Sequence, residues 1–191
     1  MSLLQFVENY PVATDKGTDK YGLGYIHEFY DKLFTPKKDS TQNLLEIGVQ
    51  EGKSILLWKD YFENATIYGV DVDECPSLHN LQRVNHIVCD AYSDHSIDLI
   101  KNDHFDIIID DGPHTYDSMV VFLTKYFSKL KSGGIMVLED IIDVNWTPKL
   151  LELVDQSLCR ATVINMAGKQ IDLQLKQRWI GGLDIIVLEK F

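Results

Sequence analysis

A chain of 191 residues that is 45% hydrophobic is long enough to bury one full core, and we expect a single domain over residues 1–191. Its formal net charge of −11, without a compensating basic run, argues against nucleic acid and anionic membranes as partners. No apolar run approaches the roughly 20 residues needed to span a bilayer, and the three cysteines lack the pairing of a disulfide or zinc framework. We expect a soluble, cytoplasmic protein that acts on a small molecule or a neutral glycan.

The chain begins with a charged, turn-rich segment at residues 15–22. An amphipathic helix follows, with apolar residues at helical spacing between Tyr25 and Phe34. We expect residues 1–42 to form an N-terminal helical lid and residues 43–191 to form the core.

From residue 43 onward, short Val, Ile and Leu runs alternate with amphipathic segments, which is typical of βα units around a parallel sheet. The predicted strands cover residues 44–48, 66–72, 86–89, 105–110, 135–139, 161–166 and 184–189. A helical stripe fills residues 115–130, and we expect the glycines at 133–134 to end that helix. The polar stretch at 168–182 predicts an antiparallel pairing of the last two strands. The fold class is therefore α/β: a Rossmann-like, doubly wound, seven-stranded sheet, mostly parallel, with the last strand antiparallel.

The turn after the first strand, residues 46–52, carries glycines but is not a dinucleotide fingerprint. Pyrophosphate binding needs G-x-G-x-x-G, and Gln50 stands at the second glycine position. A cofactor with a sulfonium and an amino-acid tail but no phosphate suits this turn better. Gly48 permits close approach, Glu46 supplies negative potential, and Gly52 lies in the same turn. These features describe S-adenosylmethionine.

Acidic residues also end the next two strands. Asp71 is placed to accept the ribose hydroxyls of such a cofactor, and Asp90 is placed near the adenine edge. The alternative is that Asp71 and Asp90 cap the following helices and that Glu46 is merely solvated. We favour the cofactor interpretation because these residues occupy successive strand ends.

Two carboxylate pairs follow buried strands, Asp110-Asp111 and Glu139-Asp140. Strand ends of a parallel sheet lie side by side, so Asp111, Glu139 and Asp140 are expected to converge on one hard cation, Mg²⁺ or a similar ion. Such an ion would hold two adjacent substrate hydroxyls and lower the pKa of one. His114 would then remove the proton. The alternative is that these acids are solvated strand ends or helix caps, with Asp110 in a structural role.

The segments at 14–20, 45–49, 109–114 and 133–141 resemble motifs of class I S-adenosylmethionine-dependent methyltransferases. The resemblance is to the metal-dependent branch that contains mycinamicin and macrocin sugar O-methyltransferases and cephalosporin-hydroxylase-like proteins. It implies magnesium ligation by Asp111, Glu139 and Asp140, with His114 as the catalytic base.

The resemblance further implies that Lys16, Gly17 and Tyr21 belong to a lid over the cofactor. Pro113 departs from the branch, where serine is usual at this position. We expect the acceptor to be bound by the N-terminal helix and by residues 143–147 and 168–182.

The activity implied is Mg²⁺-dependent methyl transfer to a sugar hydroxyl, on a deoxyhexose such as rhamnose in a glycan or glycoside. The alternatives are a catechol-type or other small-molecule O-methyltransferase and a catalytically silent S-adenosylmethionine-binding module. A nicotinamide-dependent oxidoreductase is disfavoured by Gln50. An exposed sheet edge would permit a homodimer, and so compact a unit would suit one domain of a larger glycan-building protein.

Overall fold

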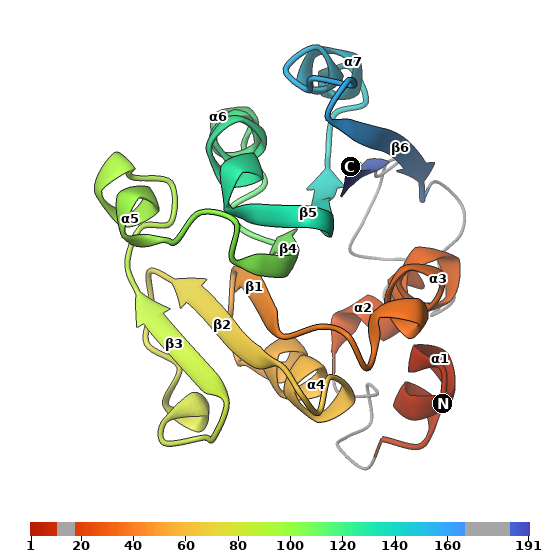
Figure 1. Ribbon diagram of the computed structural model, residues 1–191, viewed down its shortest axis with the longest axis vertical. Helices are drawn as coiled ribbons and strands as arrows, with labels where there is room; N and C mark the ends of the chain where they lie inside the picture. Colours follow the sequence, from red (N-terminus) through yellow and green to blue (C-terminus); the bar gives the residue numbers. More distant parts are fainter. Residues whose placement is uncertain (11–17, 167–183) are drawn as a thin grey trace.

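A seven-stranded sheet forms the centre of the computed structural model, which describes residues 1–10, 18–166 and 184–191 (Figure 1). The strands lie in the order β3-β2-β1-β4-β5-β7-β6. They are β1 (Asn43–Ile47), β2 (Thr66–Asp71), β3 (Val84–Val88), β4 (Phe105–Asp110), β5 (Leu130–Ile141), β6 (Cys159–Asn165) and β7 (Asp184–Lys190). Strands β1 to β5 pair in parallel, whereas β7 runs antiparallel between β5 and β6. The predicted fold class, including the antiparallel last strand, is confirmed.

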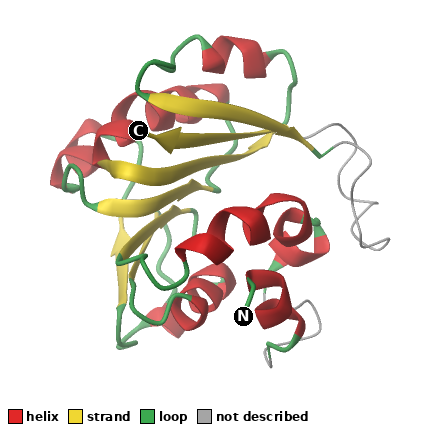
Figure 2. Cartoon of the chain, turned by 45° about the vertical axis from the view of Figure 1, so that its right-hand side comes forward, coloured by secondary structure: helices red, strands yellow, loops and turns green. Residues whose placement is uncertain are grey.

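Helices cover both faces of this sheet (Figures 1 and 2). The α-helices are α1 (Leu3–Glu8), α2 (Asp19–Gly22), α3 (Asp31–Phe34), α4 (Lys53–Tyr61), α5 (Asp94–Leu99), α6 (Tyr116–Val121) and α7 (Trp146–Leu151). There are two π-helical turns: η1 (Ile26–Tyr30) leads directly into α3, and η4 (Phe122–Tyr126) directly follows α6. Short 3-10 turns are η2 (Thr35–Lys37), η3 (Pro76–Leu78) and η5 (Phe127–Lys129).

The alternation of side chains along β4 separates two apolar cores. Ile107 and Ile109 join the core formed with α1 to α4, and Ile108 joins the core formed with α5 to α7. Burial on both faces explains why the central strands are nearly continuous runs of Ile, Leu and Val. Polar side chains are therefore concentrated at the strand ends.

The helix predicted over residues 115–130 is present but ends differently. Leu130 leaves the helix directly into β5 and pairs with Phe105, so β5 begins five positions before the predicted start at residue 135. The strand then carries an irregularity before Ile135 pairs with Ile107. Gly133, with φ of +73°, lies in that irregularity rather than at the helix end. The expectation that the glycines stop the helix was wrong.

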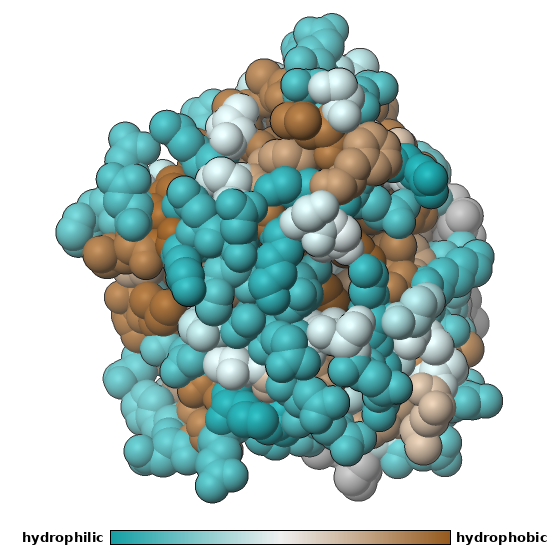
Figure 3. Space-filling model, in the orientation of Figure 1, coloured by the Kyte–Doolittle hydropathy of each residue, from teal (hydrophilic) through white to brown (hydrophobic). Residues whose placement is uncertain are grey.

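On the face seen in Figure 3, apolar surface lies at the left-hand edge, where Figure 1 places β3 and α5. Val72, Val88 and Leu99 are exposed side chains of this part of the chain. Among the described residues, no helix has the length and apolar character needed to cross a membrane. The predicted homodimer stays a prediction.

Candidate active site

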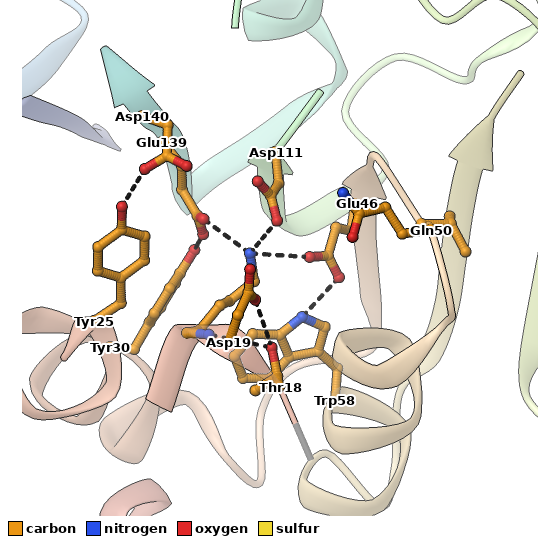
Figure 4. A network of polar contacts seen from close by, with 12 residues as sticks. Thr18, Asp19, Tyr25, Tyr30, Glu46, Gln50, Trp58, Asp111, Glu139 and Asp140 are labelled. Atoms are coloured by element: carbon orange, nitrogen blue, oxygen red, sulfur yellow. Dashed lines mark hydrogen bonds and ion pairs between the residues drawn. The ribbon is translucent and has the colours of Figure 1, made fainter. Parts of the chain in front are cut away.

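Four carboxylate side chains gather where β1, β4 and β5 end (Figure 4). Glu46 belongs to β1, Asp111 directly follows β4, and Glu139 and Asp140 lie in β5. We call these four residues the acidic rim. Asp111 is half-buried and the other three are buried. Bringing like charges together is costly, so the rim needs positive charge near it.

Gly48 sets how closely the ends of β1 and β4 approach. Its φ is +89°, and a Cβ there would lie 2.0 Å from the carbonyl oxygen of Asp111. The Asp111 N–H in turn donates to the carbonyl of Ile47 at 2.9 Å. Only glycine fits at position 48, which fixes the place of Asp111.

Lys20, in α2, supplies the positive charge. Its side chain is 1% exposed, and Nζ lies 2.5 Å from Asp111 Oδ2, 2.8 Å from Glu139 Oε2 and 3.5 Å from Glu46 Oε1. Burial by itself lowers the pKa of Lys20, but the charges of Asp111 and Glu139 raise it well above its ordinary value. Lys20 is therefore a fixed ammonium group inside the rim.

Two tyrosines from the N-terminal helices bind the pair in β5. The hydroxyl of Tyr25 donates to Asp140 Oδ1, and that of Tyr30 donates to Glu139 Oε1. Both oxygens of Glu139 are thus engaged, one by Tyr30 and one by Lys20. Burial raises the pKa of Glu139 and that of Asp140, and the charge of Asp111 raises both further.

His114 lies on the open side of the rim. Its Nε2 is 3.7 Å from Asp111 Oδ1 and 3.7 Å from Asp140 Oδ2. One ligand atom from each of these three residues lies within 4.8 Å of the other two. His114 and Asp140 have φ of +53° and +55°, a left-handed backbone that is uncommon outside glycine and that clusters at functional sites.

The rim fits a hard divalent cation by its donor chemistry. The ammonium group of Lys20 contacts three of the four carboxyl groups and Asp140 faces His114, so negative charge is left over when all four are ionised. Carboxylate oxygens are the preferred ligands of Mg²⁺ and Mn²⁺. The predicted ligands all lie at this edge, with Asp111 and Asp140 facing His114 and Glu139 turned towards Lys20.

A pocket adjoins the rim across the ends of β1, β2 and β4. It is lined by Ile47, Gly48, Gln50, Val70, Asp71, Val72, Cys89, Asp90, Ala91, Tyr92, Asp111, Gly112 and Pro113. We call it the β2–β4 pocket. Its apolar walls and its three acids, Asp71, Asp90 and Asp111, suit a ring system that carries hydroxyl groups.

Asp71 shapes the turn that borders this pocket. Its Oδ2 accepts the backbone N–H groups of Val49 at 2.7 Å and Gln50 at 3.0 Å, and its Oδ1 accepts that of Asp73 at 3.1 Å. Burial alone would raise the pKa of Asp71, but these backbone donors lower it below its ordinary value. The carboxylate is therefore ionised and held in place.

The residues predicted to bind a cofactor are divided between several places. Gly48, Asp71 and Asp90 line the β2–β4 pocket. Glu46 is buried, is not part of this lining, and accepts from Trp58 Nε1 at 2.8 Å. Gly52 begins α4 with φ of +79°, and the ring of Tyr21 packs 5.0 Å from that of His27. Lys16 and Gly17 lie outside the described residues.

Several residues of the site were not singled out from sequence. Lys20, Tyr25 and Tyr30 reach the rim from the N-terminal helices, and Tyr92 donates to Asp110 Oδ1 at 2.5 Å beneath the pocket. Tyr25 and Tyr30 fall on the apolar stripe of their helix, so the pattern marks them only as core. The Tyr92 bond gives Asp110 the structural role that the sequence allowed.

A model of a methyltransferase domain family matches residues 45–141, and the chain belongs to this family. The matched range runs from β1 to the end of β5 and contains the whole acidic rim.

Among curated proteins, the chain is 32% identical over 144 residues to the 8-demethyl-8-alpha-L-rhamnosyl tetracenomycin-C 2'-O-methyltransferase of Streptomyces olivaceus, covering 71% of this chain and 38% of that protein. It is 29% identical to the mycinamicin VI 2''-O-methyltransferase of Micromonospora griseorubida, covering 78% and 40%. The chain thus spans about two fifths of the length of these relatives. A solved structure of the MycE methyltransferase with Mg, SAH and mycinamycin VI matches with a TM-score of 0.60 and 20% identity, covering 98% of this chain and 62% of that one. That likeness shows the shared fold.

Proposed function

We propose that this chain transfers a methyl group from S-adenosylmethionine to a hydroxyl of a sugar, with Mg²⁺ at the acidic rim. The observation that carries the proposal is the meeting of Asp111, Glu139, Asp140 and His114 at one strand-end edge beside the β2–β4 pocket. The names of the curated relatives, which are glycoside O-methyltransferases, support a deoxyhexose such as rhamnose as the acceptor. The net charge of −11 supports a neutral acceptor rather than a nucleic acid.

In this proposal the β2–β4 pocket binds the donor. Asp71 accepts hydrogen bonds from the ribose hydroxyls with the lone pairs that the turn leaves open, and Asp90 lies beside the adenine. Gly48 lets the donor approach the strand ends, because no Cβ stands between the turn and Asp111.

Asp111, Glu139 and Asp140 would hold the cation, which would lower the pKa of the acceptor hydroxyl. His114 takes the hydroxyl proton at Nε2. Asp111 and Asp140, each 3.7 Å from that nitrogen, stabilise the imidazolium that results.

The acceptor side of the site carries an aromatic pair. Tyr116 at the start of α6 and Trp146 at the start of α7 are half-buried, with ring centroids 5.6 Å apart in an edge-to-face arrangement. Ile142 and Val144, which follow β5, are about half exposed. These apolar and aromatic residues follow His114 and Asp140 closely along the chain, which supports a deoxysugar, whose missing hydroxyl leaves an apolar face.

The direct test measures methyl transfer from radiolabelled S-adenosylmethionine to a panel of rhamnosides. A catechol is tested as an alternative acceptor, and binding of NAD⁺ is measured by titration for comparison with S-adenosylmethionine. We expect transfer to a sugar that stops with EDTA and returns with Mg²⁺. Transfer only to the catechol would show that the acceptor is a catechol-type small molecule and not a sugar. Donor binding without transfer to any acceptor would instead make the chain a silent binding module, and binding of NAD⁺ but not S-adenosylmethionine would refute the proposed donor.

A further inference from the structure

Lys20 contacts two of the side chains that the proposed function gives to the metal. Its Nζ lies 2.5 Å from Asp111 Oδ2 and 2.8 Å from Glu139 Oε2, with the side chain only 1% exposed. The proposed function assigns Lys20 no part in binding or chemistry. A buried lysine whose partners are proposed metal ligands needs an explanation of its own.

A divalent cation bound to the same carboxylates would lie close to the ammonium group, and two positive charges that close together repel each other. Mg²⁺ binds its oxygen ligands at about 2.0–2.1 Å and demands near-octahedral geometry. Both oxygens of Glu139 already accept a hydrogen bond, one from Tyr30 and one from Lys20. Because Lys20 Nζ contacts both Asp111 and Glu139, this repulsion favours loss of the Lys20 contacts when Glu139 joins Asp111 and Asp140 around one ion.

We propose that Lys20 is the internal counter-ion of the metal-free rim, and that it competes with the divalent cation for Asp111 and Glu139. The inference rests on the proposed metal site. Entry of the cation displaces the ammonium group from Asp111 and Glu139, so that Lys20 loses the protection that these contacts give it.

Competition makes a prediction that a merely structural ion pair does not. The apparent affinity for the ion equals the intrinsic affinity multiplied by the fraction of molecules in which the ligands are free. A counter-ion that contacts the ligands most of the time makes this fraction small and so weakens binding of the ion. Removing it therefore strengthens metal binding. If Lys20 were part of the scaffold that holds the ligands in place, its removal would leave metal binding unchanged or weaken it.

The first test measures Mn²⁺ binding by electron paramagnetic resonance and Mg²⁺ binding by calorimetry, without donor or acceptor. Lys20→Met keeps the aliphatic bulk and removes the charge. Lys32→Met, at an exposed lysine of α3, is the matched control. We expect Lys20→Met to bind Mn²⁺ about tenfold tighter or more, and Lys32→Met to bind like the unaltered protein. Equal or weaker binding by Lys20→Met would overturn the proposal.

The second test uses the unaltered chain and so does not depend on how well the variant folds. Lysines are acetylated briefly with and without saturating Mg²⁺, and each site is quantified by mass spectrometry. We expect acetylation of Lys20 to be slow without the ion and to rise several-fold with it, while Lys32 stays constant. A Lys20 that stays protected while Mg²⁺ is bound would refute displacement. Neither test involves methyl transfer, so loss of the proposed activity and loss of this inference are separate outcomes.

Discussion

The acidic rim and the β2–β4 pocket are both built from acids at strand ends, yet they are stabilised in different ways. In the pocket, Asp71 is held by three backbone N–H groups, which lower its pKa. At the rim, Glu139 and Asp140 depend on side chains from the N-terminal helices, and burial raises their pKa values. Among the described residues, the lining of the pocket therefore comes from the strand ends and the turns after them, whereas the rim also needs the ammonium group of Lys20.

The largest effect should come from the base at the rim. His114→Ala is expected to lower the rate of methyl transfer about 10²–10⁴-fold, the usual contribution of general base catalysis. Affinity for S-adenosylmethionine, measured by calorimetry, should stay the same because His114 does not line the pocket. His95→Ala, at an exposed histidine of α5, is the control. Full activity of His114→Ala would remove the base from the mechanism.

The dependence of the rim on a cation can be measured as stability. Lys20→Met leaves buried carboxylates without their counter-ion, and breaking a buried ion pair costs about 3–5 kcal/mol. We expect the free energy of urea-induced unfolding of the metal-free variant to fall by that order, and saturating Mg²⁺ to recover a large part of it. A variant as stable as the unaltered chain without Mg²⁺ would show that the rim does not need Lys20.

The acceptor surface should give a smaller effect. Trp146→Ala removes half of the aromatic pair with Tyr116, and an aromatic contact contributes about 0.5–1.5 kcal/mol. A loss of that free energy is expected to raise the KM for a rhamnoside about threefold to tenfold and to leave the affinity for the donor unchanged. A changed donor affinity with an unchanged KM would place this pair outside the acceptor site.

The smallest effect concerns the pH dependence of the pocket. The pKa of Asp71 is lowered in the folded chain, so its contribution to stability is present above the unfolded value, about 3.9, and is lost as the pH falls through the folded value. Asp71→Asn keeps an acceptor oxygen but no charge. The unaltered chain should be more stable than Asp71→Asn at pH 7, and this difference should shrink below about pH 4. A difference that does not vary with pH would exclude the charge as its source.

The sheet can be predicted from the sequence, because β1, β4 and β5 are largely runs of apolar residues that are followed by acidic residues where each strand ends. The same patterns place Asp111, Glu139 and Asp140 at one edge of a parallel sheet. They do not reveal Lys20, whose partners lie 91 and 119 residues away along the chain. A lysine in a charged, turn-rich segment is ordinarily solvated, and only the folded chain turns it inward.

The start of β5 could not be predicted from the sequence either. Pairing of Leu130 with Phe105 is a tertiary contact, and it overrides the local tendency of Gly133 and Gly134 to end a helix. The hydrogen bonds of the Tyr25 and Tyr30 hydroxyls cannot be predicted from a pattern that classes each residue only as apolar or polar. In each case the missing information is a partner that is distant along the chain.

The most direct measurement is the anomalous scattering of Mn²⁺ in crystals of this chain grown with that ion and S-adenosylhomocysteine. The account predicts one peak bonded to Asp111, Glu139 and Asp140, with the nucleoside in the β2–β4 pocket and Lys20 withdrawn from Glu139. A rim that binds no Mn²⁺ while the pocket holds the nucleoside, or a peak elsewhere with Lys20 still in place, would contradict it.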